Sequence, residues 1–161
     1  MARANHVKHA RKDYPEHDIK KGEPYYWWKF RNSPKQFSKT PPRPQQLTQS
    51  GYMSSVFDLN DTQNAICEEF ADCKKKHFNE NFESSVDEWK SAAEELRDGC
   101  QESLDNMPEH LQDTSSSGEL LTERIESLES YISEIEGIEH EVEKRHEIED
   151  RLSEVENVTL E

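Results

Sequence analysis

The chain is poor in the large apolar residues that build a globular core. Leu, Ile, Val and Phe together supply only 29 of its 161 residues, and all hydrophobic residues together make up 31%. With a formal net charge of −15, this composition lies in the range where strong charge favours disorder. A large α/β core of the kind that enzymes use is therefore not expected.

Membrane and secretion signals are missing as well. No run approaches 18 apolar residues, which argues against a membrane span. Residues 1–12 hold no apolar segment of the kind that a secretory signal needs. The three cysteines, an odd number, are typical of reduced thiols in a cytosol-like compartment. We therefore expect a cytoplasmic protein.

Signatures of catalysis and metal binding are few. The five glycines are too scattered to form a phosphate-binding loop. Cys73 and His77 are four residues apart and, with Cys67 and Cys100, are the only metal-ligand candidates that the helical spacing suggests. No Cys-x-x-Cys pair exists, and the lysines at 74–76 would repel a cation. We predict a non-enzymatic protein without metal or cofactor.

Charge is divided unevenly along the chain. Residues 1–50 hold 11 Lys+Arg and four acids, whereas residues 51–161 hold 9 basic and 31 acidic residues, so the two parts carry +7 and −22. The division follows the segment Thr40–Pro44, whose prolines favour an extended, semi-rigid linker. This asymmetry predicts two modules, 1–49 and 50–161, with different partners or with affinity for each other.

The acidic part is predicted to be helical. Apolar or neutral residues recur at helical spacings from Tyr52 to Leu104, and again in one stripe from Leu121 to Val155. Pro108 ends the first stretch, and a capping box at 116–119 starts the second. The fold class that follows is mainly α, with helices over about 50–106 and 117–157. We expect them to form a long acidic antiparallel helical hairpin or coiled coil.

Two features leave the course of these helices open. The apolar phase slips near residues 79–81, where a kink, a break or a gradual drift would each fit. Gly137 weakens the second helix by about 1 kcal/mol relative to Ala.

The narrow stripe leaves apolar surface for the N-terminal module or for a second copy to cover. The acidic residues expected to face a protein partner are Glu126, Glu129, Glu136, Glu143, Glu147 and Asp150.

The basic part contains an aromatic run, Tyr25–Arg31, followed by a turn signal at 32–34 and a second short segment. Aromatic residues favour strands, so we predict a β-hairpin. Alternation places Tyr26, Trp28 and Phe30 on a core face. The other face combines aromatic planes with cations, as binding to bases and phosphates requires. The residues expected to bind nucleic acid or another partner are Tyr25, Trp27, Lys29, Arg31, Lys35, Lys39, Arg43, Lys20 and Lys21.

Two other interpretations of this module remain open. A module of about 50 residues needs large aromatic side chains simply to build a core, and cross-strand Tyr and Trp pairs stabilise a hairpin by packing. On this view Trp28 belongs to the core and Trp27 is the better candidate for a contact. Alternatively, the cations bind the acidic helices of the same chain or of a second copy.

The N-terminal segment resembles a group of viral proteins. Its motifs HARKDYP (9–15), IKKG (19–22), YYWWKFR (25–31) and SKTPP (38–42) are similar to those of small uncharacterised bacteriophage-encoded proteins, over residues 7–50. Such proteins usually carry Gly-Gly at the hairpin turn, where this chain has Asn-Ser-Pro. The resemblance implies a viral context, and hence the cytoplasm of a host cell, but no activity.

Three functions fit the sequence. The first is an adaptor whose basic aromatic module binds nucleic acid or a nucleoprotein while the acidic helices bind a protein or oligomerise. The second is an acidic DNA mimic that inhibits a host nucleic-acid-handling or defence enzyme. The 14 acids between Glu119 and Glu156 place about one negative charge per 4 Å of helix, compared with about one per 1.7 Å along duplex DNA. The third is a structural coiled-coil component of a particle. The sequence favours the first.

Overall fold

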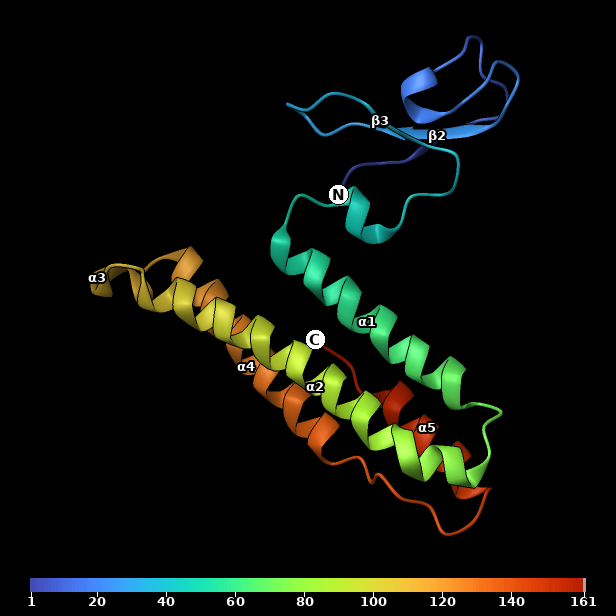
Figure 1. Ribbon diagram of the computed structural model, residues 1–161. Coiled ribbons are helices and arrows are strands. Elements are labelled where there is room, and N and C mark those ends of the chain that lie inside the picture. The colour runs from blue at the N-terminus through green and yellow to red at the C-terminus, as the bar shows by residue number, and fades with distance from the viewer. Residues whose placement is uncertain (161) are drawn as a thin grey trace. The chain divides into compact units, whose positions relative to one another are not determined.

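The computed structural model describes residues 1–160 and divides the chain into two compact units, Met1–Phe57 and Asp58–Glu161. We call them the N-terminal unit and the helical unit. The chain is mainly helical, and its small antiparallel sheet lies in the N-terminal unit, as the sequence predicts (Figure 1). The division falls within the first helix rather than in the Pro-rich segment before it.

Three short strands form the sheet of the N-terminal unit. They are β1 (Asn5–Val7), β2 (Tyr25–Trp28) and β3 (Gln36–Ser38), in the order β1-β2-β3 with antiparallel neighbours. The predicted hairpin is the pair of β2 and β3. Strand β1 was not predicted because three residues without an apolar alternation carry no strand signal. It pairs with β2 so that Asn5 lies opposite Trp27.

The face of the sheet that carries Tyr25 and Trp27 contains the small core of this unit. Tyr25 is 8% exposed and clusters with Ala10 and Ile19, while Trp27 is half-buried against the cluster. The segment between β1 and β2 folds back here, held by a β-bridge between Tyr14 and Ile19. The prediction that this face points to a ligand is therefore wrong for Tyr25, because strand alternation cannot show which face a loop will cover.

The other face carries the residues that were predicted to form the core. Trp28 is 5% exposed, in agreement with the prediction, and its buried Nε1 has no hydrogen-bond partner within the described residues. Tyr26 is only half-buried and stacks on His6, with 4.7 Å between the ring centroids. Phe30, also half-buried, lies beyond the end of β2. The predicted core is thus correct for Trp28 alone.

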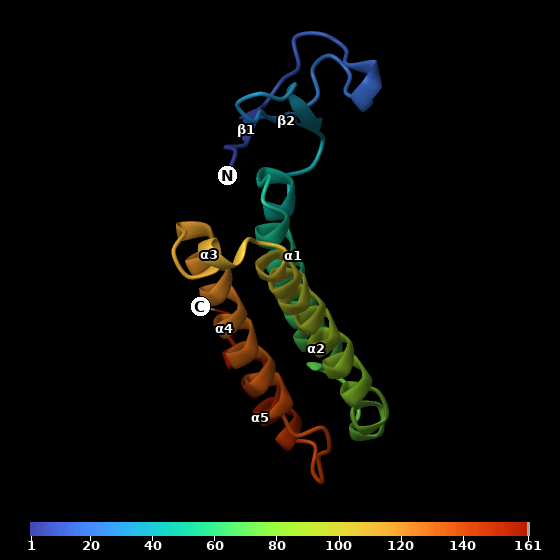
Figure 2. The ribbon, with the colours of Figure 1, turned by 90° about the vertical axis from the view of Figure 1, so that its left-hand side faces the viewer.

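Successive long helices run antiparallel in the helical unit, as Figures 1 and 2 show. Helix α2 (Lys75–Asp105) packs against α4 (Ser116–Glu136), and α5 (Glu147–Asn157) runs in the direction opposite to α4. Side chains from all four long helices, among them Ile66, Trp89, Leu128 and Val155, are almost completely buried. The helices are α1 (Gly51–Phe70), α2 (Lys75–Asp105), the single turn α3 (Glu109–Gln112), α4 (Ser116–Glu136) and α5 (Glu147–Asn157).

The helix predicted over 50–106 is in fact two helices, α1 and α2, separated by residues 71–74. Phe70 meets Phe78 and Phe82 edge to face, with 5.7 and 5.4 Å between ring centroids, and all three rings are completely buried. The chain must reverse for these rings to share one core. Residues 79–81, where the apolar phase slips, lie within α2, so the chain reverses before the slip and not at it.

The helix predicted over 117–157 is also two helices, α4 and α5, joined by residues 137–146. The apolar stripe stays buried across the connection, where Ile138 and Val142 are 4% and 3% exposed. Asn79 of α2 holds this segment: its Nδ2 donates to the carbonyl of Val142 and its Oδ1 accepts from the amide of Val142, both at 3.1 Å. The apolar stripe therefore predicted the burial of Ile138 and Val142 correctly. The backbone of Val142, however, bonds to the side chain of Asn79 and not within a helix.

Serine side chains begin two of these helices. The Oγ of Ser50 accepts a hydrogen bond from the amide of Met53 at 3.3 Å, and α1 starts at the next residue. The Oγ of Ser115 accepts from the amide of Gly118 at 3.0 Å, so α4 is capped one residue before the predicted capping box. Both caps satisfy amides that the first turn of a helix leaves without partners.

Candidate functional site

The N-terminal unit presents most of its positive charge on exposed side chains. Lys39 forms an ion pair with Asp18 at 2.7 Å and approaches Glu23 at 3.8 Å. Within the unit, all of whose residues are described, the ten other basic residues form no ion pair and are exposed. They are Arg3, Lys8, Arg11, Lys12, Lys20, Lys21, Lys29, Arg31, Lys35 and Arg43.

Two of the four acids of this unit accept hydrogen bonds from its own backbone. The carboxylate of Asp13 accepts a hydrogen bond from the amide of Lys21 at 2.6 Å, and that of Glu23 accepts from the amide of Lys20 at 2.8 Å. These bonds hold the turn before β2 without neutralising the ammonium groups of the two lysines. Lys20 and Lys21, both predicted contacts, therefore remain available to an anion.

Lys39 differs from the other predicted contacts. Its ammonium donates a hydrogen bond to Asp18, which lowers the pKa of Asp18, while the carboxylate raises the pKa of Lys39. The pair joins the end of β3 to the turn at Asp18, where the backbone has a φ of 53°. Lys39 is thus bound within the fold and is a weaker candidate for phosphate binding than its neighbours.

Lys29 and Arg31 lie at the same shallow pocket, of about 390 Å³, beyond the end of β2. The pocket is completed by Phe30, by the first two residues of the chain and by residues 48–50 before α1. Two cations at one concave surface suit an anion with several oxygens, such as a phosphate group. The structure therefore brings together two of the predicted contacts at a pocket large enough for such a group.

Trp27 and Lys35 form a second pair of predicted contacts. The Nζ of Lys35 lies 4.2 Å from the ring centroid of Trp27, which is a cation–π geometry. Trp27 is half-buried, so part of its ring remains accessible. Arg43 stands apart from both pairs: it is exposed, and its amide donates to the side chain of Gln46 in the short 3₁₀ helix η2 (Pro44–Leu47).

A further pocket of about 250 Å³ was not predicted from the sequence. Three half-buried rings line it, those of Tyr14, His17 and Phe37, together with Lys12. Tyr14 precedes the 3₁₀ helix η1 (Pro15–His17) and His17 is its last residue, whereas Phe37 belongs to β3. No spacing in the sequence indicates this group, because only the fold brings the turn and the strand together.

The predicted acidic partner face is divided among several segments. Glu126, Glu129 and Glu136 lie on α4, Glu143 lies in the connection before α5, and Glu147 and Asp150 lie in the first turn of α5. Glu136 forms an ion pair with Lys90 at 2.7 Å. The carboxylate of Glu147 accepts from the amides of Lys144 and Glu143, which lowers its pKa. The expectation of one continuous face is wrong because the helix that would carry it ends at Glu136.

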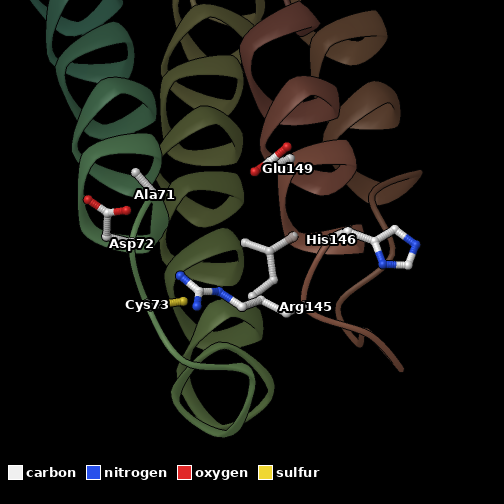
Figure 3. Close-up of a pocket in the computed structure, with 7 residues that line it drawn as sticks. Ala71, Asp72, Cys73, Arg145, His146 and Glu149 are labelled. Carbon is white, nitrogen blue, oxygen red and sulfur yellow. The ribbon is translucent and has the colours of Figure 1, made fainter.

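The helical unit has a pocket of about 420 Å³ between the α1–α2 turn and the start of α5 (Figure 3). Figure 3 shows the Arg145 side chain extending beside the sulfur of Cys73, while His146 points away from it. Burial raises the pKa of the Cys73 thiol, and the charge of Arg145 offsets only part of this rise. The thiol is therefore protonated at neutral pH, when it is a poor nucleophile.

In the part of the chain that the structure describes, no three His, Cys, Asp or Glu residues are grouped so that they could hold a metal ion. Over residues 1–160, none of the helices combines the length and the apolar character needed to cross a membrane. No family model, no curated protein and no solved structure matches the chain.

Proposed function

We propose that the N-terminal unit binds nucleic acid, and that the protein is a non-enzymatic adaptor whose helical unit holds a protein partner or a second copy. The observation that carries this proposal is the set of ten exposed basic side chains without an ion pair in their unit. Nucleic acid supplies closely spaced phosphates, and each phosphate contact releases counterions, which drives binding.

The aromatic residues support the same proposal. Trp27, with the ammonium of Lys35 over its ring, and Tyr26, stacked on His6, each combine an aromatic plane with a basic side chain. Both rings are only half-buried. Aromatic planes among cations are the usual means by which proteins bind bases and backbone together.

The proposal is tested by neutralising the cations at the pocket beyond β2. The double variant K29Q/R31Q in the full chain should weaken binding to a fluorescent 30-nucleotide DNA by about tenfold or more, because two phosphate contacts are lost. The matched control is K144Q/R145Q, which changes the net charge equally on exposed residues of the helical unit. Fluorescence anisotropy at one fixed salt concentration compares the three proteins.

The control should keep the affinity of the unmodified chain. Equal loss in both variants would mean that net charge alone governs binding, and it would overturn the assignment to the N-terminal unit. Equal affinity of K29Q/R31Q and the unmodified chain would remove the pocket beyond β2 from the interface.

One observation favours a second candidate, the acidic DNA mimic. Several cations of the helical unit are bound by its own acids: Lys90 pairs with Glu136, Arg97 pairs with Asp98, and Arg151 pairs with Glu139. The remaining carboxylates therefore dominate its surface. A mimic should compete with DNA for a DNA-binding enzyme without binding DNA itself, so direct binding of DNA by the full chain would reject it.

A further inference from the structure

The pocket formed by Tyr14, His17 and Phe37 has aromatic walls from two segments. His17 stacks on Phe37, with 4.8 Å between ring centroids and 26° between planes, and Tyr14 is tilted by 33° against Phe37 at 5.1 Å. All three residues are half-buried. The three rings therefore form an aromatic corner at one side of a pocket of about 250 Å³.

The fold holds these rings in place before any ligand arrives. The segment that carries Tyr14 is closed by its bridge to Ile19, a residue that is 1% exposed. Tyr14 also packs against the buried Tyr25, at 5.5 Å between ring centroids. The ion pair of Lys39 with Asp18 links the turn to the end of β3. A preformed pocket of this kind loses little side-chain freedom on binding.

The charges around the pocket select what enters it. The Nζ of Lys12 lies 5.3 Å from the Tyr14 ring centroid. Two acidic residues, Asp13 and Glu16, also line the pocket, and the carboxylate of Asp13 already accepts the amide of Lys21. Carboxylates repel phosphate but accept hydrogen bonds from ring and exocyclic N–H groups. The pocket therefore suits a neutral planar ring with N–H donors, whereas phosphates suit the exposed lysines outside it.

We propose that this pocket receives an unpaired base of a single-stranded nucleic acid. The inference rests on the proposed function and narrows its ligand from nucleic acid in general to single strands. In a duplex the bases are stacked and paired, so none can enter a side pocket without being flipped out at a cost. In a single strand the base is free to stack on the rings while the neighbouring phosphates bind the cations.

The test separates the contribution of the bases to the affinity from that of the sugar-phosphate backbone. The full chain is titrated with a 12-nucleotide thymidine DNA and with an abasic DNA of the same length and charge. The unmodified chain should bind the thymidine strand about tenfold more tightly, the size expected for one stacked base. The variant F37L, which keeps an apolar side chain but removes the aromatic plane, should bring this ratio close to one and leave the abasic affinity unchanged.

Gln36→Ala is the matched control, because Gln36 is exposed and precedes Phe37 on the same strand, so its side chain points to the other face. It should keep the tenfold ratio. If F37L does not fold, H17L removes the other ring of the stacked pair and gives the same test. A folded variant of either kind that keeps the ratio would overturn the proposal.

The two proposals fail in different ways. Equal affinity of the unmodified chain for the thymidine and abasic strands would reject the base pocket and leave nucleic-acid binding standing. Binding neither to these strands nor to a DNA duplex at low salt would reject the proposed function itself.

Discussion

Two side chains form hydrogen bonds with backbone groups at the end of α5 and in the connection between α4 and α5. Gln63 of α1 donates from Nε2 to the carbonyls of Val155 and Val158, at 2.6 and 2.9 Å, and so fixes the end of α5. Asn79 holds the connection between α4 and α5 in the same way through Val142. Buried backbone groups need such partners, because leaving them unpaired in the interior is costly.

The role of Asn79 predicts the effect of removing it. The variant N79A leaves both the amide and the carbonyl of Val142 without partners, so we expect it to lower the free energy of unfolding by about 1–3 kcal/mol. The control is N81A, two residues further along α2, whose side chain forms its hydrogen bonds with His77 in its own helix among the described residues. Urea unfolding should show the control within about 0.5 kcal/mol of the unmodified chain. A similar, small effect of both variants would contradict the role of Asn79.

At the scale of the elements, the contact between α2 and α4 centres on two aromatic rings. Trp89 and Tyr131 are 0% and 1% exposed, meet edge to face at 5.6 Å, and share a hydrogen bond from Nε1 to the phenol oxygen at 3.1 Å. Burial raises the pKa of Tyr131 from its ordinary value of 10.0 to about 12. The phenol therefore stays neutral in the folded protein over a pH range in which it ionises in the unfolded chain.

This difference predicts how stability depends on pH. Because the pKa is raised in the folded state, the stabilisation is complete below pH 10 and is lost as the pH rises toward 12. The variant Y131F lacks this ionisation. The difference in unfolding free energy between the unmodified chain and Y131F should therefore shrink between pH 10 and pH 12, as measured by urea unfolding. A difference independent of pH over that range would contradict the burial of Tyr131.

The junction of α3 and α4 is close-packed at one glycine. A Cβ at Gly118 would lie 2.0 Å from the carbonyl oxygen of Gln112, whereas a Cβ at Gly99, within α2, would meet nothing within 4 Å. We expect G118A to destabilise the helical unit by about 1–3 kcal/mol through overpacking. G99A should stabilise it by about 0.5–1 kcal/mol through helix propensity. Thermal unfolding midpoints that move in the same direction for both variants would contradict this packing.

Particular residues show how much of the molecule the sequence could predict. The stripe from Leu121 to Val155 predicted burial correctly except at Leu121, which is half-buried, because helical spacing records which side chains face a core. The phase slip near 79–81 lies inside α2, so no helix ends there, and the chain reverses at residues 71–74 instead. The break itself contains neither proline nor glycine, so the packing of Phe70 on Phe78 and Phe82 determines it, and local signals do not.

The candidate site was predictable to a smaller extent. Lys29 and Arg31 were predicted as contacts and do line one pocket. Tyr25 was placed correctly on the face of Trp27, but that face was predicted to meet a ligand, whereas the loop around Ile19 covers it at Tyr25. The rings of Tyr14 and Phe37 lie far apart in sequence, so their pocket could emerge only from the folded chain.

At the scale of the whole molecule, the central claim is that exposed cations of the N-terminal unit bind the backbone of a single-stranded nucleic acid. The most direct measurement is the affinity of the full chain for a 30-nucleotide single-stranded DNA as salt rises from 50 to 200 mM. If about five cations contact phosphates, the affinity should fall by about 100-fold over this range. An affinity that does not change with salt, or no binding at 50 mM, would contradict the account.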